Sequence, residues 1–200
     1  MAGGAAKREI EVKLRLRSPE QARRLLYKAG FRVSLRRRHE DNLVFDTPDR
    51  GMRARGLLLR LRRSGRDATL TYKGPAATRT YKSRQELETA VGDPEVLETI
   101  MGVLGFEIVF RYEKFRTEYR CLDRRGVVTL DETPIGTFLE LEGEPNWIDH
   151  VAGRLEFSEL AYITDSYASL YWSERDPTED SPTEMLFPRQ PPKRRSPPPP

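Results

Sequence analysis

The stretch REIEVKLRLR near the N-terminus places charged and aliphatic side chains at alternating positions. Glu9, Glu11 and Lys13 share one parity, whereas Ile10 and Val12 share the other. In a β-strand the residues of one parity project from one face, so these charges would lie together. If that face meets water, the stretch is an ordinary half-buried strand. If it faces an enclosed space, the carboxylates suit a hard divalent cation and the lysine suits an anion.

The same alternation recurs in the stretches LLLRLRR, TLTYKG, SRQELE, YEKFRTEYR and FLELEG. Taken alone, each would be explained by a solvated outer face. Taken together, and with helices that need an apolar surface to cover, they favour a charged face that points inward. The charged positions that would then share one interior are Arg60, Arg62, Lys73, Arg84, Glu86, Glu88, Lys114, Arg116, Glu140 and Glu142.

Two amphipathic helices are expected at residues 19–29 and 94–104. Each opens on a capping residue followed by proline, carries an apolar stripe and stops at a glycine. Shorter helices are expected at 147–155, capped by Asn146, and at 165–172. Their apolar faces need a surface to cover, and the aliphatic faces of the strands provide one.

Eight strands are expected, joined mostly by hairpins, since turn sequences such as SGRD, DRRG and TPIG separate several of them. An eight-stranded barrel has an interior wide enough for side chains or one small ligand. The sequence therefore predicts an α+β fold, a closed antiparallel eight-stranded β-barrel with a polar lumen (a tunnel) and flanking helices. The expected strands are residues 9–17, 36–46, 57–63, 68–74, 82–89, 110–122, 127–131 and 137–143.

A lumen of this composition is costly to desolvate unless its charges are paired or engaged by a ligand. Lysines and arginines from several strands match a polyanion whose charges are strung along its length. The glutamate pairs, spaced i and i+2, match a divalent cation such as Mg²⁺, which typically bridges carboxylate and phosphate oxygens. Together the two sets predict the binding of a metal-bound polyphosphate.

The stretch EIEVK resembles the ExExK signature of the CYTH superfamily, the triphosphate tunnel metalloenzymes. It is followed in the order of that family by FDTPD, LRLR, TYKGP, KSRQELE, YEKFRTEY, LDETPIGTFLELEG and ITDSYASL. The resemblance covers about residues 8–171, nearly all of the expected folded part. This family includes class IV adenylyl cyclases, thiamine triphosphatases and inorganic triphosphatases.

The resemblance implies a role for each charged position of the lumen. One or two divalent cations, Mg²⁺ or Mn²⁺, would be bound by Glu9, Glu11, Glu140 and Glu142, with Glu86 and Glu88 as further acids. The triphosphate oxygens would be bound by Lys13, Arg60, Arg62, Lys73, Arg84, Lys114 and Arg116. Three lysines are also candidates for a catalytic general base, although phosphate binding is the preferred role for each: Lys13, Lys73 and Lys114.

The reaction implied is metal-dependent hydrolysis of a phosphoanhydride bond in inorganic triphosphate or a small organic triphosphate, such as thiamine triphosphate or a nucleotide. One alternative is a class IV adenylyl cyclase, which converts ATP to cyclic AMP and pyrophosphate. A second is a non-catalytic module that binds polyphosphate or nucleotides. The lumen residues do not choose between the two reactions. A nucleoside-sized pocket beside the triphosphate would distinguish the cyclase.

Composition limits the partners. The net charge is +4, but residues 189–200 hold four basic residues and no acid, so residues 1–188 are neutral overall and no nucleic-acid surface is expected. No run of about 18 apolar residues indicates a membrane span, and a cytoplasmic protein with a single cysteine and no internal disulfide is expected. The expected partner is a small-molecule triphosphate, with the chain as a monomer or homodimer.

Three regions are expected: a flexible N-terminus at 1–8, the tunnel domain at 9–174, and a basic, proline-rich, disordered tail at 175–200. The tail is expected to be a solubilising segment rather than a ligand for a proline-binding module or an anionic surface, and any partner is unspecified.

Several other residues of chemically useful types are assigned structural roles. No zinc spacing, dinucleotide motif or P-loop is present. Surface roles are expected for His39 and His150, burial for Cys121, packing for Tyr162 and Tyr167, and either the tunnel mouth or a solvated strand for residues 36–38.

Overall fold

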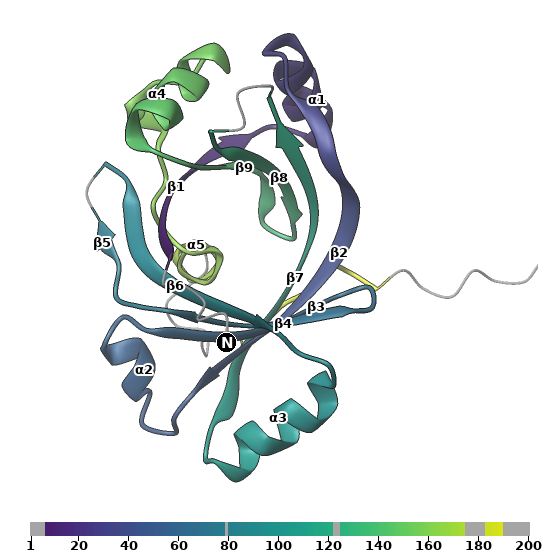
Figure 1. The fold of residues 1–200 in the computed structure, drawn as a ribbon, viewed down its shortest axis with the longest axis vertical. Helices are drawn as coiled ribbons and strands as arrows, with labels where there is room; N and C mark the ends of the chain where they lie inside the picture. Colours follow the sequence, from purple (N-terminus) through teal and green to yellow (C-terminus); the bar gives the residue numbers. More distant parts are fainter. Residues whose placement is uncertain (1–6, 79, 122–124, 175–182, 190–200) are drawn as a thin grey trace, which may run out of the picture.

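The computed structural model describes residues 7–78, 80–121, 125–174 and 183–189. Eight antiparallel strands close into the expected barrel, in which β6 pairs with β1 to complete the ring (Figure 1). Around the ring the strands are β1 (Lys7–Leu16), β9 (Gly136–Glu142), β8 (Val127–Thr133), β7 (Glu107–Arg120), β2 (Arg32–Asp46), β3 (Leu58–Ser64), β4 (Asp67–Lys73) and β6 (Lys82–Ala90). Two short strands are added to it, β5 (Ala77–Thr78) on β6 and β10 (Glu184–Met185), which runs parallel to β7.

The helices cover the outside of the barrel, as the sequence predicts. α1 (Pro19–Lys28) and α4 (Pro145–Arg154) lie over β1, β8 and β9, and α3 (Pro94–Val103) lies over β2, β3 and β4 (Figure 1). The first core cluster joins Leu26 and Ile148 of the helices to Val12 and Leu139 of the strands, all with no exposed surface. Because the aliphatic parity is buried under helices, the charged parity of each strand points into the lumen.

Helix α4 differs from the expectation at its start. It begins at Pro145, so Glu144 and not Asn146 occupies the capping position, and no side chain caps it. Proline fits the first helical position because its missing amide hydrogen would have no partner there. Two short helical segments were not predicted, α2 (Gly51–Ala54) and the 3₁₀ segment η1 (Glu159–Ala161). None of the helices in the described ranges is long and apolar enough to cross a membrane.

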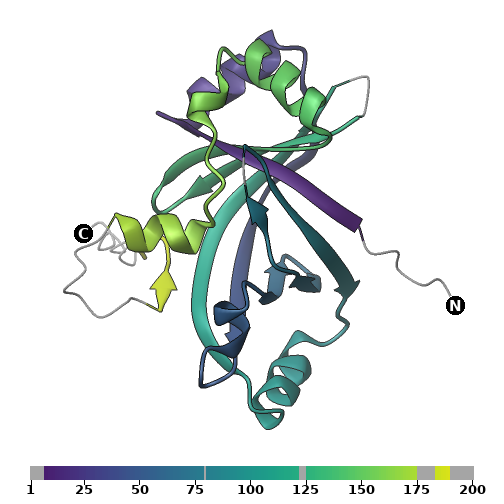
Figure 2. The same ribbon diagram turned by 90° about the vertical axis from the view of Figure 1, so that its left-hand side faces the viewer.

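Helix α5 (Tyr167–Ser173) lies across one end of the barrel, inside the ring in Figure 1 and to one side of it in Figure 2. It packs on aromatic side chains that share the inward parity of β7 and β9. This end cluster is made of Phe110, Tyr112, Phe138, Tyr167 and Met185. The lumen is therefore apolar at the end that α5 covers and charged elsewhere.

The chain ends differ in part from the expected disorder. Lys7 and Arg8 already belong to β1, while residues 1–6 of the expected flexible N-terminus lie outside the described residues. Residues 183–189 of the expected tail lie along β7, where Met185 is fully buried and Phe187 packs 5.2 Å from the ring of Phe115. These apolar side chains explain the docking. The rest of the predicted tail, 175–182 and 190–200, lies outside the described residues.

Candidate active site

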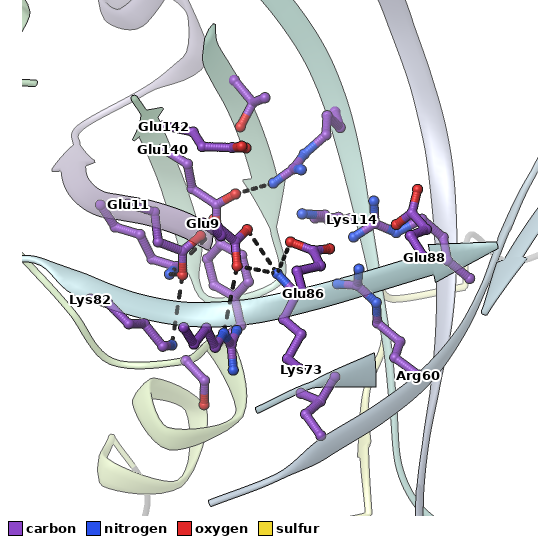
Figure 3. A pocket seen from close by; sticks show the side chains of 18 of the residues that line it. Glu9, Glu11, Arg60, Lys73, Lys82, Glu86, Glu88, Lys114, Glu140 and Glu142 are labelled. Atoms are coloured by element: carbon purple, nitrogen blue, oxygen red, sulfur yellow. Dashed lines mark hydrogen bonds and ion pairs between the residues drawn. The ribbon is translucent and has the colours of Figure 1, made fainter. Parts of the chain in front are cut away.

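The barrel lumen contains a cavity of about 530 Å³ (Figure 3). Every residue that the sequence predicts for metal binding, phosphate binding or catalysis lines this cavity. These are Glu9, Glu11, Lys13, Arg60, Arg62, Lys73, Arg84, Glu86, Glu88, Lys114, Arg116, Glu140 and Glu142. The alternation of the strands brings them together from β1, β3, β4, β6, β7 and β9.

Lys73 on β4 is the centre of one group of ion pairs in this cavity. Its ammonium nitrogen lies 2.8 and 2.6 Å from the two carboxylate oxygens of Glu9 and 3.3 Å from Glu86 (Figure 3). Arg84 approaches Glu9 from the other side, at 3.5 Å. Burial, together with the charge of neighbouring Glu11, nevertheless raises the pKa of Glu9. The two cations therefore do not fully offset the effects of burial and of Glu11 on Glu9.

Lys13 on β1 lies between two carboxylates, 3.4 Å from Glu11 and 3.4 Å from Glu140. Burial disfavours its charge, but Glu11 and Glu140 outweigh burial and raise the pKa of Lys13 to about 12. The pKa of Glu11 would be raised by burial, yet Lys13 and the other nearby cations lower it to about 2. Lys13 thus stays protonated near neutral pH, which suits an anion contact better than a general base.

Asp131 on β8 holds the cations of β7 in place and was not singled out from the sequence. It has no exposed surface and accepts hydrogen bonds from Lys114 at 2.8 Å and from Arg116 at 2.7 and 2.5 Å. Arg116 also pairs with Glu140. The signal existed in VVTLDET, where Asp131 has the inward parity, and the expected strand ended at this residue.

Three further charged residues of the lumen were missed, namely Glu40, Lys82 and Glu118, the last of which lines the cavity from β7. Glu40 on β2 is almost fully buried and lies 3.2 Å from Arg62 and 3.6 Å from Lys114. Lys82 on β6 lines the cavity 3.7 Å from Glu11, and burial, helped by Lys13, lowers its pKa to about 8. Lys82 shares the parity of predicted Arg84, so the same alternation identifies it.

Tyr167 closes the cavity at the end covered by α5. Its hydroxyl donates to Asp131 at 2.8 Å, and its ring lies 5.3 Å from the ammonium nitrogens of both Lys13 and Lys114. The predicted packing role is therefore incomplete, because Tyr167 also lines the cavity. Tyr162, in contrast, donates to Asp149 at 2.9 Å and does not line the cavity.

The remaining candidates lie outside the cavity. Residues 36–38 are exposed, as in the solvated-strand alternative, and the histidines at 39 and 150 are exposed as expected. His39 lies 3.5 Å from Glu113. Cys121 is half-buried rather than buried, because it follows the last residue of β7 at the edge of the first core cluster.

The carboxylates of the lumen have the right chemistry for a hard divalent cation but are turned toward cations of the protein. Among the described residues, no three histidine, cysteine, aspartate or glutamate side chains come close enough together to hold a metal ion. Glu11 nevertheless lies near enough to Glu9 and Glu140 for mutual repulsion to raise pKa values. A shared divalent cation would relieve this repulsion, so the donor set fits such an ion once the side chains turn from their lysine and arginine partners.

Comparisons with known proteins agree with the barrel and its signature. A Methanocaldococcus jannaschii protein provisionally named an adenylate cyclase is 31% identical over 134 residues, which cover 67% of this chain and 75% of that protein. A provisionally named adenylate cyclase from Vibrio parahaemolyticus superposes with a TM-score of 0.72 at 20% identity, covering 83% of this chain and 98% of its own.

A second related structure is an adenylyl cyclase candidate from Hippeastrum, described as having a dominant triphosphatase activity. It superposes with a TM-score of 0.67 at 22% identity, covering 85% of this chain and 98% of its own. Residues 7–180 match the CYTH domain. Because this match spans the whole barrel and its covering helices, the chain belongs to the CYTH domain family.

Proposed function

We propose that this protein is a divalent-metal-dependent triphosphatase, which hydrolyses a phosphoanhydride bond of inorganic triphosphate or a small organic triphosphate within the barrel lumen. The observation that carries the proposal is the set of buried and half-buried lysines and arginines that five strands direct into one cavity. Burial of this many cations is costly unless a polyanion engages them.

The cations are arranged to contact a chain of phosphates along its length. Arginine binds phosphate oxygens with a planar fork and lysine binds them as a mobile point charge. Arg60 and Arg62 on β3 and Lys114 on β7 lie on the two strands that flank β2, and Lys73 and Arg84 lie near Glu9. In the proposed complex these cations exchange their carboxylate partners for phosphate oxygens, and they offset the charge that develops during phosphoryl transfer.

The carboxylates released in this exchange would bind Mg²⁺ or Mn²⁺. Glu9, Glu11 and Glu140 are the principal ligands in the proposal, with Glu86, Glu88 and Glu142 as further acids. A divalent cation bound there would act as a Lewis acid toward the phosphate oxygens. Without such a cation the carboxylates would repel the substrate, so the full acidic set argues against a module that only binds polyphosphate.

The lining of the cavity favours hydrolysis over cyclisation. Leu58 and Leu87 are the only aliphatic residues that line it within the described part of the chain. The rings of Tyr112 and Tyr167 lie 5.9 and 5.3 Å from the rings of Phe110 and Phe138, so they are covered by other aromatic side chains. A purine needs a flat apolar wall, and this cavity offers little of one.

The test is a substrate panel on the full chain with Mg²⁺ or Mn²⁺, with products separated by ion-exchange chromatography. Tripolyphosphate should yield phosphate and pyrophosphate, and EDTA should abolish this turnover. Cyclic AMP as the main product from ATP would establish the cyclase instead. Binding of tripolyphosphate, thiamine triphosphate and ATP without turnover of any of them would establish a non-catalytic module.

A further inference from the structure

Tyr112 on β7 differs from three other hydrogen-bonded tyrosines of the described chain, Tyr81, Tyr162 and Tyr167. Tyr81 and Tyr162 donate their hydroxyl hydrogens to Asp149, and Tyr167 donates to Asp131. The Tyr112 hydroxyl instead accepts a hydrogen bond from the guanidinium of Arg60 at 3.3 Å. Within the described residues no carboxylate accepts a hydrogen bond from it. Its oxygen is therefore held as an acceptor inside the lumen.

The surroundings of this phenol are cationic. Arg60 and Arg62 approach from β3 and Lys114 from β7, while Glu40 on β2 is occupied by Arg62 and Lys114. Burial would raise the pKa of the Tyr112 phenol, but Arg60, then Lys114 and Arg62, outweigh burial and lower it to about 8. The burial and carboxylate partners of Tyr167 raise its pKa instead. Within the same lumen the pKa of Tyr112 is thus lowered and the pKa of Tyr167 is raised.

The position of Tyr112 matches that of a group acting on the substrate. It lines the same cavity as the cations proposed to bind triphosphate, and three of these cations surround its hydroxyl. A phosphoryl group held by Arg60 and Lys114 would lie beside the phenol oxygen, because both cations are near the Tyr112 hydroxyl. Lys13, one of the lysine candidates for a base, is held protonated by Glu11 and Glu140.

We propose that Tyr112 is the general base of the reaction, an assignment that rests on the proposed triphosphatase function. The phenolate oxygen of Tyr112 takes a proton from the attacking water as the water oxygen forms its bond to the terminal phosphorus. The bond from that phosphorus to the bridging oxygen breaks, and pyrophosphate leaves with the bonding electrons. The phenol then returns its proton to solvent. Atoms and charge balance with water and triphosphate as the only reactants.

The first experiment reads ionisation of the phenol without any activity. The absorbance of tyrosinate at about 295 nm is followed from about pH 6 to pH 11 in the wild-type protein and in Tyr112→Phe. One phenol that ionises near pH 8 should be present in the wild type and absent from the variant. Tyr81→Phe, which removes a phenol outside the lumen, should retain that transition. Absence of a phenol that ionises below about pH 9.5 in the wild type would overturn the proposal.

The second experiment measures kcat/KM for tripolyphosphate as a function of pH. In the wild type kcat/KM should rise about tenfold per pH unit up to about pH 8 and then level off, because the active form is the phenolate. Tyr112→Phe should lower the plateau by about 100-fold and abolish the rise. A Tyr112→Phe protein that has only a raised KM and an unchanged pH profile would show that Tyr112 merely positions Arg60, which overturns the proposal.

A matched variant tests whether the rise in kcat/KM comes from Tyr112 or from Lys82, whose pKa is also lowered to about 8. Lys82→Arg keeps the positive charge through this range and should preserve the rise in kcat/KM. Loss of the rise in Lys82→Arg would assign it to Lys82 and overturn the role of Tyr112. A wild type with the phenol transition but no turnover would refute the proposed function, and the base role with it.

Discussion

Replacing Asp131 by asparagine should destabilise the protein strongly, because one buried carboxylate holds two cations and a phenol. Oδ2 of Asp131 accepts from Lys114 at 2.8 Å, from Arg116 at 2.5 Å and from Tyr167 at 2.8 Å, while Oδ1 accepts from Arg116 at 2.7 Å. Asparagine keeps one acceptor and presents an amide donor where the other stood. Up to three of these hydrogen bonds would be lost, and the amide hydrogens would face two cations.

The magnitude follows from the partners that remain. Breaking a buried ion pair by removing one partner typically costs about 3–5 kcal/mol. Arg116 keeps its contact with Glu140, and Lys114 keeps Glu40 at 3.6 Å, so the cations are not fully orphaned. We therefore expect a loss of about 3–4 kcal/mol in the free energy of unfolding, which corresponds to about 10 °C in Tm for a chain of this size.

The assay is urea unfolding at pH 7, followed by circular dichroism, for the wild type, Asp131→Asn and a control. Asp67→Asn is a matched control, since the Asp67 side chain is 81% exposed and lies 3.8 Å from Arg38. The control should change the free energy of unfolding by less than about 0.5 kcal/mol. A loss below about 1 kcal/mol for Asp131→Asn would refute the conclusion that Asp131 anchors Lys114 and Arg116.

Three further predictions concern stability. Nearby cations outweigh burial and lower the pKa of Glu11 and Glu40 to about 2. The stability that these carboxylates contribute is therefore present above about pH 4.5 and lost as the pH falls toward 2. A Tm that does not fall between these two pH values would contradict this prediction. Met185→Ala should cost about 2–3 kcal/mol in urea unfolding, because Met185 is fully buried in the end cluster, and an unchanged midpoint would show that β10 is not docked. Glu140→Gln should lower the free energy of unfolding by about 1–2 kcal/mol. The reason is that Arg116 holds the pKa of Glu140 well below its usual range, against the effect of burial. A gain in stability would mean that repulsion from Glu11 dominates.

The strict alternation of charged and apolar residues explains why so much of the lumen could be predicted. With a side-chain period of two, the only open question is which face of each strand is buried. The predicted amphipathic helices answered it, because they need the apolar faces of the strands to cover. Glu40 was missed because β2 has register shifts between Val33 and Leu35 and between Leu35 and Arg38. An irregular strand breaks the parity, so RRRHED could not be assigned an inward face from its pattern alone.

Other features depend on contacts between distant parts of the chain. Lys73 pairs with Glu9, which is 64 residues away, and no local pattern specifies that partner. The seven-residue helix α5 has a recognisable cap, Ser166, but its place across the barrel end is fixed by packing on Phe110 and Phe138. The docking of Met185 on β7 could not be predicted, because Met185 lies in a proline-rich segment. Composition describes the average of such a segment and does not identify one apolar residue that packs on the barrel.

The most direct test of the account is the rate of phosphate release from tripolyphosphate by the full chain with Mg²⁺ or Mn²⁺. It is measured beside EDTA-treated protein and beside Glu140→Gln, at a temperature at which both proteins are folded. We expect release by the wild type, none above background in EDTA, and a rate at least about 100-fold lower in Glu140→Gln. Equal rates with and without the metal, or in the wild type and Glu140→Gln, would contradict a metal-assisted reaction in this lumen.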